Sequence, residues 1–245
     1  MAYAVFDVET RVDKALLNRV YHDGEGLSDN DAYERHRAEL KRRRGSDFFP
    51  ITLHIPISIA IGMAGDDHVL HSVESLAHGD YSEEKLVREF WMRADRFAGT
   101  LVTFNGRRFD LPVLELAALR HGIAAPHYFS GSSNVRKRYA DDRHLDLLDF
   151  ISNYGAIALS GGLNLLLKMI GMPGKTDVEG SQVQELYETG RLDDIHRYCR
   201  DDVAQTYFLF LRVELMRGRI DEAKYRAAFD ASKKFLGAGA QVNPQ

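Results

Sequence analysis

The chain has 245 residues, of which 44% are hydrophobic and 28% charged, and its formal net charge is -4. This length and composition are typical of one globular domain and exclude a fibrous or wholly disordered protein. The negative charge argues against a protein that coats nucleic acid by bulk attraction, although it leaves room for local basic patches.

Neither a membrane span nor a disulfide is expected. The longest apolar stretch, residues 51–64, is interrupted by His54, Pro56 and Ser58, so it does not predict a transmembrane helix. Asp7 lies too close to the N-terminus for a secretory signal peptide, and we therefore expect a cytoplasmic protein. The single cysteine, Cys199, excludes an intrachain disulfide and a cysteine-based zinc cluster. Any bound metal is then expected to have oxygen ligands.

Residues 3–10, Tyr-Ala-Val-Phe-Asp-Val-Glu-Thr, predict a buried strand that carries two acids. Because side chains alternate along a strand, Asp7 and Glu9 share one face. Two such charges about 4 Å apart repel by about 4 kcal/mol at an effective dielectric near 20, and a divalent cation would reverse that repulsion. We therefore interpret the pair as part of a metal site. The alternative is that both acids face solvent or cap the next turn.

Residues 11–50 form a polar insertion, which we expect to be a surface flap. Within it, residues 29–44 predict a helix capped by Ser28 or Asp29. The basic run at 41–44 is interpreted either as a phosphate contact or as a solvated helix end. Residues 51–62 and 68–75 then predict two strands of an antiparallel meander, with Pro56 at an edge or a bulge.

The rest of the chain alternates helix and strand and then becomes helical. A helix starts at Ser82 and ends near Gly99, and further helices are predicted over 111–120, 160–171, 181–190, 192–217 and 221–236. Strands are predicted over 101–105 and at the start of 144–150, where the chain turns into a short helix. This order favours an α/β fold with a mixed central sheet flanked by helices. We expect one domain over residues 1–236 and a disordered tail over 237–245.

Two more acids are candidates for the same site. Asp110 follows the strand 101–105 and is either a site residue or an ordinary helix N-cap. Tyr198 and Asp202 lie four residues apart and share a helix face, whereas His196 and Asp201 offer a competing His-x4-Asp pattern. The apolar stripe of the helix favours the first pair as inward-facing; its members are Ile195, Cys199, Val203, Thr206 and Phe210. An inward acid needs a cation, a hydrogen-bond network or a salt bridge to an arginine.

Three motifs occur in order along the chain: Phe-Asp-Val-Glu-Thr, then Phe-Asn-Gly-Arg-Arg-Phe-Asp-Leu-Pro-Val-Leu, then Tyr-Cys-Arg-Asp-Asp-Val-Ala-Gln-Thr. Together they resemble the DEDD superfamily of 3′-to-5′ exonucleases that have a tyrosine in the last motif. The resemblance is to the proofreading exonuclease domains of family-B DNA polymerases in stand-alone form. It runs from Tyr3 to about Leu211 and implies a ribonuclease H-like fold.

The resemblance also implies roles for single residues. Asp7, Glu9, Asp110 and Asp202 would hold two Mg²⁺ or Mn²⁺ ions, and Tyr198 would orient the attacking water. The terminal nucleotides would contact Thr10, Asn105, Gly106 and Phe109, although Asn105 and Gly106 have a turn, and Phe109 the core, as alternatives. Lys175 lies in a loop that would reach phosphate, but the segment is not a P-loop, because Met169 replaces the first glycine.

The function expected from these residues is a metal-dependent 3′-to-5′ exonuclease. It would release nucleoside 5′-monophosphates from single-stranded 3′ ends, and DNA is favoured over RNA because the resemblance is to DNA proofreading domains. An exoribonuclease that trims RNA is the alternative. A third hypothesis is an inactive nucleic-acid-binding or scaffold module.

Overall fold

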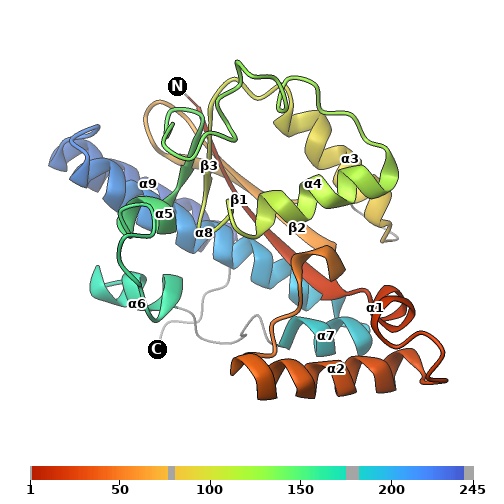
Figure 1. Ribbon diagram of the computed structural model, residues 1–245. Helices are drawn as coiled ribbons and strands as arrows, with labels where there is room; N and C mark the ends of the chain where they lie inside the picture. The colour runs from red at the N-terminus through yellow and green to blue at the C-terminus, as the bar shows by residue number, and fades with distance from the viewer. Residues whose placement is uncertain (1, 77–80, 175–181, 240–245) are drawn as a thin grey trace.

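A five-stranded mixed sheet forms the centre of the molecule (Figure 1). The computed structural model describes residues 2–76, 81–174 and 182–239. The strand order is β3-β2-β1-β4-β5, and the strands are β1 (Tyr3–Val12), β2 (His54–Ala64), β3 (Leu70–Ser75), β4 (Thr100–Thr103) and β5 (His144–Asp146). The pairs β1–β2 and β2–β3 are antiparallel, whereas β1–β4 and β4–β5 are parallel. The predicted meander and mixed sheet are confirmed.

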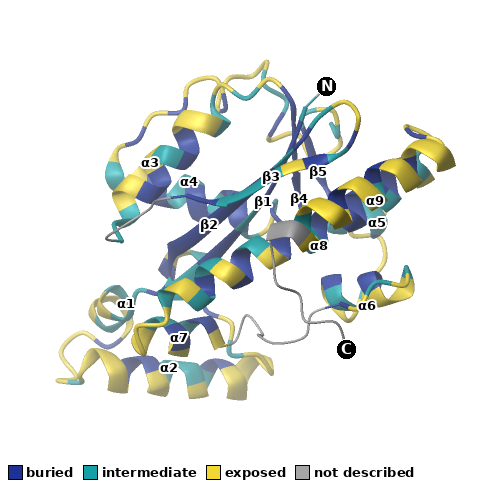
Figure 2. Cartoon of the chain, turned by 180° about the vertical axis from the view of Figure 1, so that it is seen from behind, coloured by how far each residue is buried: buried dark blue, intermediate teal, exposed yellow. Residues whose placement is uncertain are grey.

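Helices cover both faces of this sheet (Figure 1). One face carries α3 (Glu83–Ala94) and α4 (Asp110–His121), and its core includes Phe6, Phe90, Trp91 and Leu114. The other face carries α8 (Leu192–Met216), together with α5 (Leu147–Ile151), α6 (Gly162–Met169) and α9 (Glu222–Gly239). Figure 2 shows the strands as mostly buried, with exposed residues on the outer sides of the helices. The sheet therefore separates two apolar cores.

Strand β1 contributes alternate residues to the two cores. Tyr3 and Val5 pack on the α8 side, whereas Phe6 and Val8 pack on the side of α3 and α4. The alternation predicted from residues 3–10 is therefore correct, and it sets Asp7 on the side of α8.

Two irregularities open the sheet near the end of β1. Strand β4 pairs with β1 only from Tyr3 to Val5, so no strand among the described residues pairs with the later part of β1 on that side. On the other side, the register of β1 against β2 shifts between Glu9 and Thr10, opposite Pro56. This is the bulge that Pro56 indicated, and bulges of this kind redirect side chains beside functional sites.

The insertion is a packed unit with its own small core. Helix α2 (Asp29–Arg44) has the predicted bounds, with Ser28 as N-cap and Gly45 in the left-handed conformation after its last turn. The short helix α1 (Lys14–Tyr21) was not predicted, although Leu16, Leu17 and Val20 recur at helical spacing; Leu17 is its only buried residue. The insertion core joins both helices to the segment around the 3₁₀ turn η1 (Ile51–Leu53); it consists of Val12, Leu17, Ala32, Tyr33, Leu40, Phe49 and Leu53.

Other element ends differ slightly from the predictions. Helix α3 ends at Ala94 rather than near Gly99, because the Asp95 carboxylate accepts a hydrogen bond from Tyr128 N and ties the chain to a later loop. Helix α7 (Val183–Glu188) lies within the predicted range 181–190, whose first residue is outside the described part. Helix α9 continues to Gly239, and residues 240–245 of the tail lie outside the described residues. Within the described ranges, no helix has the length and hydropathy of a membrane span.

Candidate metal centre

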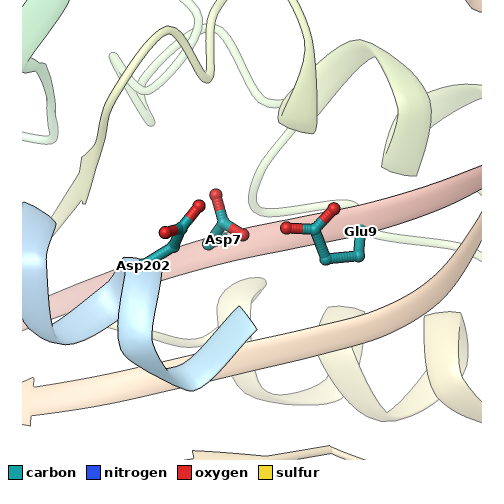
Figure 3. A group of neighbouring side chains, drawn as sticks. All are labelled: Asp7, Glu9 and Asp202. Carbon is teal, nitrogen blue, oxygen red and sulfur yellow. The ribbon is translucent and has the colours of Figure 1, made fainter. Parts of the chain in front are cut away.

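Three carboxylates from the two ends of the chain meet beside β1. Asp7 and Glu9 come from β1 and Asp202 comes from α8, and each offers an oxygen within 4.8 Å of the others. Figure 3 shows the three groups gathered on one side of the strand. Glu9 and Asp202 are buried, and Asp7 is half-buried. Three of the four acids that the resemblance implies for one metal site therefore converge.

The phase of α8 selects Asp202 over its neighbour. Every member of the apolar stripe predicted for this helix is buried, and so are Tyr198 and Asp202. Asp201 is exposed, and His196 turns towards β2, where its Nδ1 lies 2.8 Å from Ser58 Oγ. The competing pair of His196 and Asp201 therefore does not point into the acidic centre.

Asp110 lies next to the centre but is not one of its three converging groups. It is the first residue inside α4, so it is not the N-cap, and its Oδ1 accepts a hydrogen bond of 3.0 Å from Val8 N. This contact occupies the edge of β1 that β4 leaves unpaired. Burial raises the pKa of Asp110 well above its usual range, and the nearby charge of Asp7 raises it further.

Tyr198 and Cys199 both border the carboxylates. Burial raises the pKa of Tyr198, and the charges of Asp202, Glu9 and Asp7 raise it further, so its phenol stays protonated at neutral pH. The Cys199 thiol is fully buried and lies 3.6 Å from Asp7 Oδ2, and burial raises its pKa as well. Both groups therefore face the centre as neutral hydrogen-bond donors. The sequence placed Cys199 on the inward stripe of the helix but did not indicate its contact with Asp7.

Asp146 is a residue of the site region that sequence reasoning missed. Its carboxylate accepts backbone hydrogen bonds from Asn105 at 3.0 Å and Arg107 at 2.9 Å, and also caps α5 through Leu148 N and Asp149 N. It therefore fixes the loop that leads into α4. The available signal was an aspartate at the junction of a predicted strand and helix.

A pocket of about 460 Å³ opens directly beside Glu9. Thr10, His54, Phe109 and Phe48 line it, and Phe48 comes from the insertion. The ring of Phe48 stacks on His54 at 5.2 Å and lies 5.8 Å from the ring of Phe109. The sequence did not indicate Phe48 or His54, because this pocket exists only after the insertion folds back against β1.

The hydrogen bonds of His54 fix the role of the Thr10 hydroxyl. His54 Nε2 lies 3.3 Å from the carbonyl oxygen of Phe49, which can only accept. Burial lowers the pKa of His54, so the ring is neutral at pH 7, and its Nδ1 accepts the 2.8 Å hydrogen bond from Thr10 Oγ1. The Thr10 oxygen therefore keeps its lone pairs for an outside donor.

The remaining predicted contact residues lie in the turn before α4 or outside the described part. Asn105 has a positive φ of 67°, and its side-chain amide has no hydrogen-bond partner among the described residues. Gly106 is buried, and a Cβ there would lie 2.4 Å from Thr103 Oγ1, so the turn excludes any side chain. Lys175 lies outside the described residues.

The donor set of this centre suits a hard divalent cation. All three converging ligand groups are carboxylates, and two of them are buried. Oxygen ligands of this kind are preferred by Mg²⁺, Mn²⁺ and Ca²⁺. Burial raises the pKa values of Tyr198 and Asp110, and the negative charge collected here raises them further. A cation would relieve the repulsion, so the residues present fit a metal site.

The strand order and the acidic centre define a ribonuclease H-like protein with a carboxylate site. The structure matches the family-B DNA polymerase of the hyperthermophilic archaeon Pyrobaculum calidifontis with a TM-score of 0.56 and 15% sequence identity. The match covers 88% of this chain and 24% of the polymerase, so the chain spans about a quarter of that protein's length. This likeness confirms the predicted fold.

Residues 46–245 match the sequence model of a family described as "predicted 3′-5′ exonuclease related to the exonuclease domain of PolB". The chain belongs to this family, which confirms the resemblance inferred from the three motifs. A search of curated proteins gave no significant match. The family implies metal dependence and a nucleic-acid substrate.

Proposed function

We propose that the protein is a metal-dependent 3′-to-5′ exonuclease that shortens single-stranded DNA and releases nucleoside 5′-monophosphates. The observation that supports this proposal is the convergence of Asp7, Glu9 and Asp202 within 4.8 Å of one another, beside a pocket that Glu9 also lines. Carboxylates hold the cations that phosphodiester hydrolysis needs, and a pocket beside them positions the end of a strand.

Asp7, Glu9, Asp110 and Asp202 would hold two Mg²⁺ or Mn²⁺ ions, and Asp110 also accepts the hydrogen bond from Val8 N, the residue after Asp7. When bound, such ions supply positive charge at the scissile phosphate and make a water molecule easier to deprotonate. Tyr198 stays protonated beside Asp202, so we assign it to orienting the attacking water by hydrogen bonding. The water oxygen joins the phosphorus, and the 3′ oxygen of the preceding nucleotide leaves and takes a proton.

The pocket beside Glu9 would hold the terminal nucleotide. Phe109 and Phe48 present aromatic surface on which a base of any identity stacks. The Thr10 hydroxyl donates its hydrogen bond to His54, so its oxygen can accept another hydrogen bond. The 3′-hydroxyl of the strand end is a donor that fits this position. A strand end with a free 3′-hydroxyl therefore fits this pocket.

Digestion of matched oligomers tests the proposal. A 5′-labelled DNA oligomer and its RNA twin, incubated with Mg²⁺, should both give ladders that shorten from the 3′ end, with DNA shortened faster. Faster loss of RNA would favour the exoribonuclease alternative, since discrimination depends on how the pocket treats the 2′-hydroxyl.

A variant that lacks the acidic centre distinguishes the exonuclease hypothesis from the hypothesis of an inactive binding module. Asp7→Ala combined with Asp202→Ala should abolish nucleotide release and keep the circular dichroism spectrum of the folded protein. Digestion at the wild-type rate by the folded variant would contradict the proposed centre. A wild-type protein that binds the oligomer with Mg²⁺ or Mn²⁺ but never shortens it would support the inactive module.

A further inference from the structure

A basic pocket of about 310 Å³ flanks the loop that leads into α4. Among the residues that the structure describes, four arginines line it, Arg107, Arg108, Arg136 and Arg138, together with two carboxylates, those of Glu115 and Asp149. The lining thus carries a surplus of positive charge in a protein whose net charge is negative. This volume is far more than a single water molecule needs, and it leaves room for a phosphodiester group.

The two opposing carboxylates orient arginines in the pocket. Arg138 donates to both oxygens of Asp149, at 3.2 and 3.0 Å, and also to the carbonyl of Tyr154 at 2.7 Å. Arg136 donates to both oxygens of Glu115, at 3.1 and 3.2 Å. Guanidinium groups that are already held in place lose little conformational freedom when they bind an anion.

Arg108 is the arginine that is available for a ligand. It is exposed and forms no salt bridge within the described part of the chain. A Cβ added at Gly155 would lie 3.0 Å from Arg108 Nη2 and 3.2 Å from Arg138 Nη2. The guanidinium groups of Arg108 and Arg138 therefore both lie next to Gly155. An oxyanion bound between them would reduce their repulsion and accept hydrogen bonds from both.

The loop that carries Arg107 and Arg108 also reaches the proposed active site. Asp146 holds the backbone of Asn105 and Arg107, Phe109 lines the pocket beside Glu9, and Asp110 contacts β1. The position of this loop thus sets the basic pocket and the nucleotide pocket relative to each other.

We propose that the basic pocket binds backbone phosphates of the substrate strand, a few nucleotides to the 5′ side of the bond that is cut. The planar guanidinium group of an arginine can donate two parallel hydrogen bonds to the oxygens of one phosphate. The direction of the bound strand in this inference rests on the proposed function. The binding itself does not, because a protein can bind a strand without cutting it.

Equilibrium binding tests the pocket without digestion. The background is the Asp7→Ala, Asp202→Ala protein, and fluorescence anisotropy measures its affinity for a labelled single-stranded 12-mer and for a trinucleotide. Arg108→Glu should weaken 12-mer binding at least tenfold and trinucleotide binding less than twofold. Arg108→Ala should lower the salt dependence of log Kd for the 12-mer by about 0.7, the value of one phosphate contact on a single strand.

Matched controls make the result specific. Arg226, which is exposed on α9 and pairs with Glu222, is replaced by alanine and should leave both affinities unchanged. The melting temperature of the Arg108 variants should equal that of the background, because this side chain is exposed.

Several results would overturn the inference. One is that Arg108→Glu weakens the affinity for the 12-mer and for the trinucleotide equally, or weakens neither. Another is that the background protein does not bind the 12-mer at all. Displacement of the 12-mer by millimolar inorganic phosphate would instead identify a site for small anions and would also overturn it. If Arg108 supports 12-mer binding while the wild-type protein digests nothing, the inference stands and the proposed function fails.

Discussion

At the scale of the residue, Asp202 is expected to lower the stability of the folded protein when no cation is bound. Its oxygen lies within 4.8 Å of those of Asp7 and Glu9, and the repulsion destabilises the folded state. Asp202→Asn keeps the shape and removes one charge. In EDTA we expect the variant to melt about 2–4 °C higher, which corresponds to about 1 kcal/mol for a domain of this size.

Calorimetry with and without Mn²⁺ checks this expectation. Wild-type protein should gain thermal stability from Mn²⁺ because the ion binds only the folded centre, and Asp202→Asn should gain less. A lower melting temperature of the variant in EDTA would show that the hydrogen bonds of the carboxylate outweigh the repulsion.

Glu214 is a buried acid on α8, away from the candidate site, and it predicts a pH effect. Burial raises its pKa, but His68, whose Nε2 lies 3.5 Å from Glu214 Oε2, and Arg217, which donates a hydrogen bond of 3.0 Å to Oε1, lower it more, so the net pKa lies below its usual range. The ionised form therefore stabilises the fold above the unfolded pKa of about 4.3, and this contribution is lost as the pH falls through the lowered value.

Denaturant unfolding of Glu214→Gln measures that contribution. At pH 7 the variant should be less stable by about 1.5–3 kcal/mol, the value of a hydrogen-bonded charged group, and the difference should shrink as the pH falls below about 4.3. The exposed Glu222→Gln on α9 is the control. A difference that stays constant from pH 7 to pH 3.5 would refute the assignment.

At the scale of the element, the spacing of apolar residues predicted which side chains share a face of a single strand or helix. The period of a strand placed Asp7 and Glu9 together, and the period of a helix separated Asp202 from Asp201, because each face follows from one regular backbone. The contact of Asp110 with Val8 was not predictable in this way, since it depends on where β4 stops beside β1. Phe48 and Asp146 likewise act across segments that are distant in the sequence.

The loop before α4 depends on Asp146, which is buried and accepts four backbone N–H groups. Asp146→Ala leaves these donors without their acceptor, so we expect a loss of about 2–5 kcal/mol in unfolding free energy. We also expect lower exonuclease activity, because the loop carries Phe109 and leads to Asp110. Asp146→Asn should be milder in both measurements.

Denaturant unfolding and single-turnover digestion provide the two readouts. Asp230→Ala, an exposed change on α9, should affect neither. Unchanged stability in Asp146→Ala would mean that water replaces the carboxylate and that the loop needs no such support.

The insertion contributes Phe48 to the pocket beside Glu9, where its side chain is 56% exposed although it is large and apolar. If a base stacks on it, Phe48→Ala should raise the KM for oligomers about tenfold, within the range of about 1–3 kcal/mol for one stacked base, with little change in kcat. Phe235→Ala on α9 is the matched control, since Phe235 is 38% exposed. A fall in kcat without a change in KM would contradict a stacking role.

At the scale of the whole molecule, β1 joins parts that otherwise have separate cores. Its residues enter the core under α8, the core under α3 and α4, and, through Val12, the insertion core. The order of elements predicted the two large cores, because helices that alternate with strands must cover a sheet on both faces. The insertion core was not predicted, because it depends on contacts between α1, α2 and the segment around η1, which no single element determines.

The insertion core is small, which predicts that this unit opens before the rest of the protein. Its apolar contacts involve few residues of α1 and α2, whereas α8 packs along most of its length against the sheet. Local opening follows the amount of buried apolar contact. Amides of α1 and α2 should therefore exchange with deuterium at least tenfold faster than those of β1 and α8, a difference of about 1.4 kcal/mol or more. Equal protection in a mass-spectrometric time course would mean that the insertion unfolds only with the whole sheet, and the pocket wall at Phe48 would then be as rigid as β1 itself.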